Sequence, residues 1–235
     1  MSPIEWILLG FGMGVALWAE FKLKGAYARY SQVGTRLNVT GAQTAREILD
    51  RNGLRQVEIH EVPGELSDHY DPSRRAVFLS SDIFHGTSIA SVAVAAHEVG
   101  HALQHQQAYG PLGLRMALVP ITGFASRAAM FLVLGGVVLG NLPIASTLLW
   151  IGVGCYAILA FFQLVTLPVE YDASARAKVQ LNQIGLVTRE EFPGVERMLS
   201  AAAVTYVAAM LAALITLLRL ILIARSRDHT TGRDR

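Results

Sequence analysis

The sequence predicts a mainly α-helical membrane protein with about four spanning helices and one small α+β domain. Only 16% of the 235 residues are charged, whereas ordinary soluble domains carry roughly 25%. Several apolar stretches approach the ~20 residues that a spanning helix requires. The polar segments between them contain short strand and helix patterns, and the longer segment is large enough to fold.

The apolar stretches justify the four spanning helices. The first is expected to remain as an uncleaved anchor, because no basic residue precedes it and Lys22 and Lys24 follow it. Asn141, Leu142 and Pro143 predict a tight hairpin between the second and third stretches, since Pro ends helices and Asn favours turns. The four stretches cover residues 4–19, 116–139, 144–167 and 201–223.

The chain is therefore expected to divide into six consecutive segments. These are an anchor (1–20), a first polar segment (21–115), a transmembrane hairpin (116–168), a second polar segment (169–199), a last spanning helix (200–224) and a basic tail (225–235). The composition of the tail predicts disorder.

The first polar segment contains the α+β pattern. "TGAQTAREILDRNGL" predicts a helix with Thr40 or Gly41 as its N-cap and Gly53 as its C-cap. "VEIHEV" and "RAVFLS" predict two short strands, separated by the turn-rich "PGELSDHYDPS". A helix is then expected from about Thr87 onward, with Thr87 or Ser88 as its cap.

This last helix contains "AAHEVGHALQHQ", in which two histidines lie four residues apart. Residues on an α-helix turn about 100° each, so His97 and His101 share a face and could bind one tetrahedral zinc ion. Glu98 points beside the open coordination position, where it could take a proton from water and pass it to a leaving amine. Gly100 has no side chain, which leaves room for a second helix or a substrate to approach this turn. A chance pattern or a pair of core histidines is the alternative, but the strand–turn–helix setting favours zinc.

His105 is not expected to be the third protein ligand, because on a straight helix it lies about 12 Å from His97. Acids that follow the third apolar stretch are better candidates. Pro168 is expected to open that helix ahead of Glu170 and Asp172, which point to different faces. We assign Glu170 as the ligand and Asp172 as the residue that orients a ligand histidine. Two alternatives stay open: Asp172 is the ligand, or both acids are solvated at a helix start.

Four motifs together carry a family resemblance: "TGAQTAREILDRNGL", "VPGELSDHYDP", "AAHEVGHALQHQ" and "FQLVTLPVEYDASARA". In this order and among these spans, they resemble the YugP-type neutral zinc metallopeptidases of bacterial membranes. The resemblance runs from Gly41 to about Leu199. It implies a zincin-like metallopeptidase domain with the two histidines and Glu170 as zinc ligands and Glu98 as catalytic acid/base. HtpX-type and CaaX-prenyl proteases are distantly similar, but in them an aspartate follows the ligand glutamate after a longer gap, which leaves the roles of Glu170 and Asp172 open.

Peptide hydrolysis also needs a donor that stabilises the oxyanion. Among His69, Tyr70 and Arg176 we favour His69 as this catalytic residue, because an Asp-rich turn between two strands can present it toward the helix with the histidine pair. The alternative is that the turn is explained by Asp71 and Pro72 alone. The strand "RAVFLS" is a candidate edge for binding an extended peptide, unless the preceding strand covers it.

The distribution of basic residues bears on orientation and partners. Those after the first and third spans place the site in the cytoplasm by the positive-inside rule, whereas the arginines of the tail favour the opposite orientation. The net charge of +2 and the absence of a basic cluster argue against nucleic acid as a partner. A polypeptide, such as a membrane or misfolded protein, and the lipid bilayer are the expected partners.

The leading functional interpretation is a membrane-embedded, zinc-dependent endopeptidase. The first alternative is a non-catalytic membrane protein that keeps the histidine pair as a structural metal site. A transporter is the second, and it is disfavoured because the acids and histidines cluster beside a polar segment while only Arg127 interrupts the spans.

Overall fold

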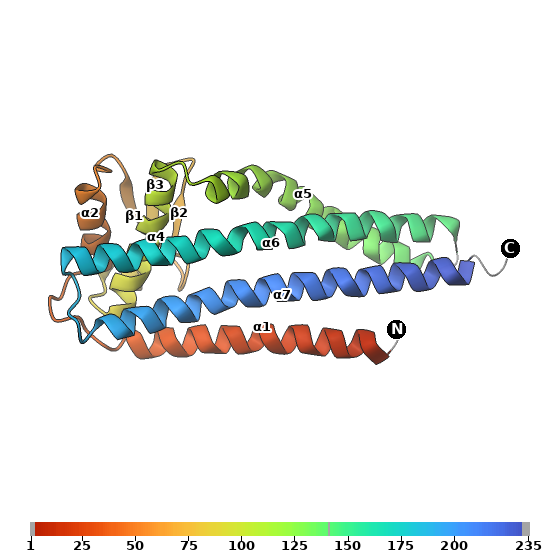
Figure 1. Ribbon diagram of the computed structural model, residues 1–235, viewed down its shortest axis with the longest axis horizontal. Helices are drawn as coiled ribbons and strands as arrows, with labels where there is room; N and C mark the ends of the chain where they lie inside the picture. Colours follow the sequence, from red (N-terminus) through yellow and green to blue (C-terminus); the bar gives the residue numbers. More distant parts are fainter. Residues whose placement is uncertain (1–2, 141, 232–235) are drawn as a thin grey trace. The chain divides into compact units, whose positions relative to one another are not determined.

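The computed structural model describes residues 3–140 and 142–231, and these residues are mainly helical (Figure 1). Among these described residues, four helices are long and apolar enough to cross a membrane. They are α1 (Pro3–Tyr30), α5 (Gly110–Val138), α6 (Pro143–Ile184) and α7 (Phe192–Thr231). Together with a small three-stranded sheet, they confirm the predicted class of a mainly α-helical membrane protein with a small α+β part.

The chain forms two compact units. The first, which we call the span unit, comprises residues 1–18, 114–167 and 206–235. In it Leu149 of α6 packs with Leu220 and Ala224 of α7. The Arg227 side chain of α7 donates hydrogen bonds to backbone carbonyls at the end of α5, among them that of Gly136 at 2.7 Å. The predicted hairpin between the second and third spans falls between α5 and α6, although Asn141 lies outside the described residues.

The second unit, which we call the site unit, comprises residues 19–113 and 168–205. It contains the sheet, and its hydrophobic core joins α2 and α4 to the sheet, to the C-terminal part of α6 and to the first turns of α7. The elements that complete it are α2 (Gly41–Arg51), β1 (Glu58–Val62), β2 (His69–Asp71), β3 (Ala76–Ser80), α3 (Ser81–His85) and α4 (Ile89–Gln106).

Local capping explains where two of these helices begin. Thr40 and Gln43 form a reciprocal capping box at the start of α2: each side chain accepts a hydrogen bond from the other residue's backbone N–H. At the start of α4, the Ser88 hydroxyl accepts from the backbone N–H of Ser91 at 3.1 Å. The sequence offered two candidates for each cap, Thr40 or Gly41 and Thr87 or Ser88, and the structure selects Thr40 and Ser88. Gly53 follows α2 with a φ of 74°, the left-handed conformation that glycine adopts at low cost.

The sheet corrects one functional prediction. The strand order is β1-β3-β2, with β1 parallel and β2 antiparallel to β3. The strand "RAVFLS" corresponds to β3, which is central and buried at all five residues, so it offers no free edge to a peptide. The edge strands among the described residues are β1 and the short β2, which lies inside the segment predicted only as turns. Three residues flanked by turn formers give too short a pattern to identify β2 from the sequence.

Two predictions about helix ends are also wrong. α6 continues through Pro168 instead of opening there. Proline removes one N–H donor, but Val169, Ala173 and Ala177, which follow Pro168 in α6, are fully buried, and this packing keeps the segment helical. α7 likewise continues to Thr231, through most of the tail that composition predicted as disordered.

Candidate metal centre

The helix α4 carries its polar residues in an apolar setting. His97, Glu98 and His101 are all buried, at 9%, 7% and 7% exposure, and most of the other buried residues of α4 are small or aliphatic. Burial of this many polar groups is costly unless each finds a partner or a metal ion. The environment of each group therefore decides what the site can do.

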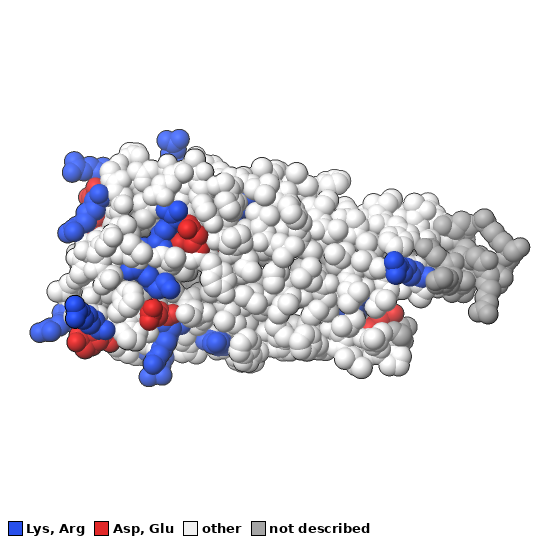
Figure 2. All heavy atoms as spheres, viewed as in Figure 1, with Lys and Arg blue, Asp and Glu red and all other residues white. Residues whose placement is uncertain are grey.

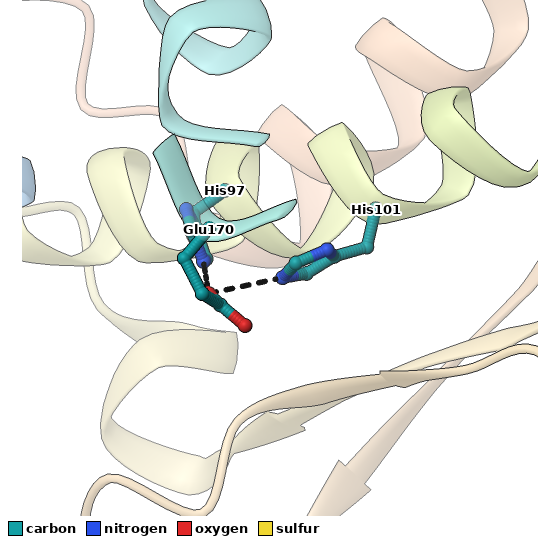
Figure 3. Close-up of side chains that lie close together, drawn as sticks. All are labelled: His97, His101 and Glu170. Atoms are coloured by element: carbon teal, nitrogen blue, oxygen red, sulfur yellow. Dashed lines mark hydrogen bonds and ion pairs between the residues drawn. The ribbon is translucent and has the colours of Figure 1, made fainter. Parts of the chain in front are cut away.

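The structure brings the three predicted ligands together (Figure 3). The Nε2 atoms of His97 and His101 lie 3.2 and 3.5 Å from Oε2 of Glu170. One ligand atom from each residue lies within 4.8 Å of the other two. Glu170 comes from α6, 73 residues after His97, so two helices far apart in sequence form the group.

A glycine allows these two helices to approach. A Cβ atom on Gly100 would overlap the backbone carbonyl of Ala173 in α6. The prediction that Gly100 leaves room for a second helix is therefore confirmed. Because Ala173 lies one turn after Glu170, the contact at Gly100 sets how close the Glu170 carboxylate comes to the histidine rings.

The second ring nitrogen of each histidine also has a partner. Nδ1 of His101 lies 3.0 Å from Oε1 of Gln104, and the Gln104 amide nitrogen donates to the Val169 carbonyl at 2.7 Å. Because the Gln104 nitrogen donates to Val169, the atom that faces His101 is the amide oxygen Oε1, which accepts a hydrogen bond. Nδ1 of His101 therefore carries the proton, and Nε2 presents its lone pair toward Glu170. Nδ1 of His97 lies 3.1 Å from the hydroxyl of Ser174, which can accept in the same way.

Asp172 lies outside the three-residue group. Its carboxylate accepts hydrogen bonds from the Gln104 amide at 2.8 Å and from the Arg176 guanidinium. Asp172 thus contacts a histidine of the group only through Gln104, whereas the sequence suggested a direct contact. Sequence reasoning missed Gln104 and Ser174, although Gln104 is three residues after His101, a spacing that places two side chains on one helix face.

Glu98 does not belong to the three-residue group but is buried beside it. Burial raises the pKa of the Glu98 carboxyl above its ordinary value, while the neighbouring His97 and His101 lower it in part. A carboxylate with a raised pKa is a stronger base than an exposed one, which suits proton transfer near neutral pH.

The other predicted candidates have contacts elsewhere. His69 is exposed on β2; its ring stacks on Phe78 with centroids 4.8 Å apart, and its Nδ1 lies 2.8 Å from the Ser67 carbonyl. The Tyr70 hydroxyl lies 2.9 Å from Nδ1 of His105. Neither histidine is part of the three-residue group, and the oxyanion role of His69 stays a prediction.

The donor set fits zinc. Two imidazole nitrogens and one carboxylate oxygen are the ligands of many catalytic zinc sites, which keep a fourth position for water or substrate. Partners on the outer ring nitrogens fix ring orientation and tautomer, as in known zinc sites. The absence of a thiolate from the group and the burial of all three residues are consistent with a catalytic ion of this kind.

The chain matches known proteins over nearly its whole length. The family described as "Putative neutral zinc metallopeptidase" matches residues 5–225. A protein of Bacillus subtilis (strain 168) named "Putative membrane protease YugP" is 49% identical over 222 residues, which cover 94% of this chain and 95% of that protein. No solved structure matches the chain. Both matches agree with the resemblance carried by the four motifs.

Proposed function

The chain belongs to the neutral zinc metallopeptidase family, and from this premise we propose that it is a zinc-dependent endopeptidase embedded in the membrane. The observation that carries the proposal is the buried group of His97, His101 and Glu170 beside the buried Glu98. Zinc is the metal of the family, and this group could hold such an ion.

The proposed mechanism assigns a separate task to each residue. His97, His101 and Glu170 would hold the ion, which when bound polarises the peptide carbonyl and makes water a stronger nucleophile. Glu98 takes the proton of the attacking water and then donates it to the leaving amine. Ser174 and Gln104 keep the imidazole rings oriented, and the apolar residues around them exclude bulk water.

The burial of Glu98 favours catalysis over a purely structural metal site. A structural site needs ligands that complete its coordination, but it does not need an additional buried carboxyl group with a raised pKa. Keeping Glu98 in this environment costs stability, since desolvation penalises its charged form. A role as general base explains why that cost is tolerated.

The test is Glu98→Gln in the purified full chain, assayed with unfolded casein. The amide keeps the size of the side chain but cannot accept the proton, so we expect cleavage to fall by about 10²–10⁴-fold with zinc content unchanged. Glu47→Gln, on the exposed side of α2, is the matched control and should keep full activity. His97→Ala should lose both zinc and activity.

Two results would contradict the proposal. Casein cleavage that persists in Glu98→Gln would remove Glu98 from the mechanism. A wild-type protein that carries zinc but cleaves no unfolded polypeptide would instead support the structural metal site.

The protein is a membrane protein whose family acts on polypeptides. We propose that membrane or misfolded proteins are its substrates, because Glu170 follows the apolar stretch of α6 by only three residues. Basic residues after the first and third spans favour a site on the cytoplasmic face.

A further inference from the structure

A cavity of about 610 Å³ lies in the site unit between α1 and the first turns of α7. Its charged lining consists of Lys22 and Arg29 from α1 and of Glu196 and Arg197 from α7. Three cationic groups against one carboxylate leave an excess of two positive charges. No residue of the predicted zinc site lines this cavity, so it needs a separate explanation.

The cavity lies where both helices leave their apolar stretches. Lys22 follows the end of the first stretch by three residues, and Ser200, which also lines the cavity, directly precedes the last stretch. Exposed Trp18 and Phe21 come just before Lys22, and aromatic residues of this kind mark the boundary between membrane and water. The sequence therefore places the cavity at the level of the lipid headgroups. Figure 2 shows Lys and Arg side chains over the site unit, with Asp and Glu side chains among them.

Packing holds part of the cavity wall in place. Tyr30 lines the cavity and is 6% exposed, and the Arg29 guanidinium lies 5.6 Å from the centre of its ring. A Cβ atom on Gly194 would come within 3.2 Å of the same ring, so the glycine lets α7 pack closely against Tyr30. Arg29 therefore lies on an ordered aromatic surface.

We propose that this cavity binds the phosphate headgroup of an anionic phospholipid, with phosphatidylglycerol as the type case. Guanidinium groups bind phosphate oxygens through paired hydrogen bonds, and the Lys22 ammonium adds a compact positive charge. Basic pockets between spanning helices are suited to acidic headgroups. Glu196 and Ser200 offer acceptors for the hydroxyl groups of a glycerol headgroup. The excess positive charge favours this lipid over a zwitterionic one.

The test measures lipid binding by the delipidated full chain in detergent, using native mass spectrometry. Phosphatidylglycerol, phosphatidylethanolamine with the same acyl chains, and glycerol phosphate are titrated separately. The triple variant Lys22→Gln, Arg29→Gln and Arg197→Gln should bind phosphatidylglycerol on the order of 100-fold more weakly, which is about fivefold for each cation removed. The charge-matched control replaces three exposed cations outside the cavity, Lys24, Arg51 and Arg55, with Gln and should bind as the wild type does.

Each other outcome overturns the proposal. Equal weakening in the control would assign binding to general surface charge, and unchanged binding in the triple variant would exclude the cavity. Glycerol phosphate that binds as tightly as the lipid would identify a free phosphate compound as the ligand. Zinc content reports whether the triple variant folds. If it does not fold, Arg197→Gln alone must show the fivefold loss, or the proposal fails.

Discussion

Gln104 is a fully buried residue that joins the zinc group to the rest of the site unit. Its amide contacts His101, Val169 and Asp172 at once. Gln104→Ala would leave Nδ1 of His101 without its acceptor. Residues that hydrogen-bond to the outer ring nitrogen of a ligand histidine typically contribute 10–100-fold to metal affinity. We therefore expect zinc to bind about 10–100-fold more weakly, measured by competition with a chelator of known affinity.

The matched control for this substitution is Gln106→Ala on the same helix. Gln106 also donates a side-chain hydrogen bond, to the Asn52 carbonyl, but it contacts no residue of the zinc group. Its zinc affinity should equal that of the wild type. A Gln104→Ala protein whose affinity stays within threefold of the wild type would show that the His101 contact does not tune the metal.

At the scale of secondary structure, the packing of α4 against α6 determines whether the ligands meet. Gly100→Ala would force the two helices apart, because the new methyl group meets the Ala173 backbone rather than a flexible side chain. Overpacking of this kind costs about 1–3 kcal/mol. We expect a lower thermal midpoint and reduced zinc content, since Glu170 moves with α6. The control is Gly113→Ala, whose Cβ would meet nothing within 4 Å; its zinc content should be unchanged and its thermal midpoint unchanged or higher. Equal losses of zinc and of thermal midpoint in the two variants would refute the packing argument.

At the scale of the whole molecule, we predict that the chain crosses the membrane once between Arg55 and Leu142, because the apolar helix α5 separates these two residues in the sequence. The single cysteine, Cys155, is first replaced by Ala. Two variants then each carry one new cysteine, at exposed Arg55 or at exposed Leu142, which reports on which side of the membrane that residue lies. For a cytoplasmic site, an impermeant maleimide should label Leu142→Cys in intact cells and Arg55→Cys only after permeabilisation. The reverse pattern would place the site outside.

Much of the fold could be predicted because it depends on local patterns. The spans follow from stretches of apolar residues, and the caps at Thr40 and Ser88 follow from side chains that bond to the adjacent backbone. The errors occurred where distant contacts decided the outcome. β3 became central because β1 and β2 pair with it on both sides, and α6 stayed helical at Pro168 because buried neighbours hold it.

The same division applies to the site. The spacing of His97, Glu98 and His101 determined their common helix and relative directions, since helical geometry fixes residues four apart on one face. Which later acid meets the two rings, and what supports their outer nitrogens, depended on how α6 crosses α4 at Gly100. That crossing is set by the packing of segments more than 70 residues apart, and no local pattern in the sequence encodes it.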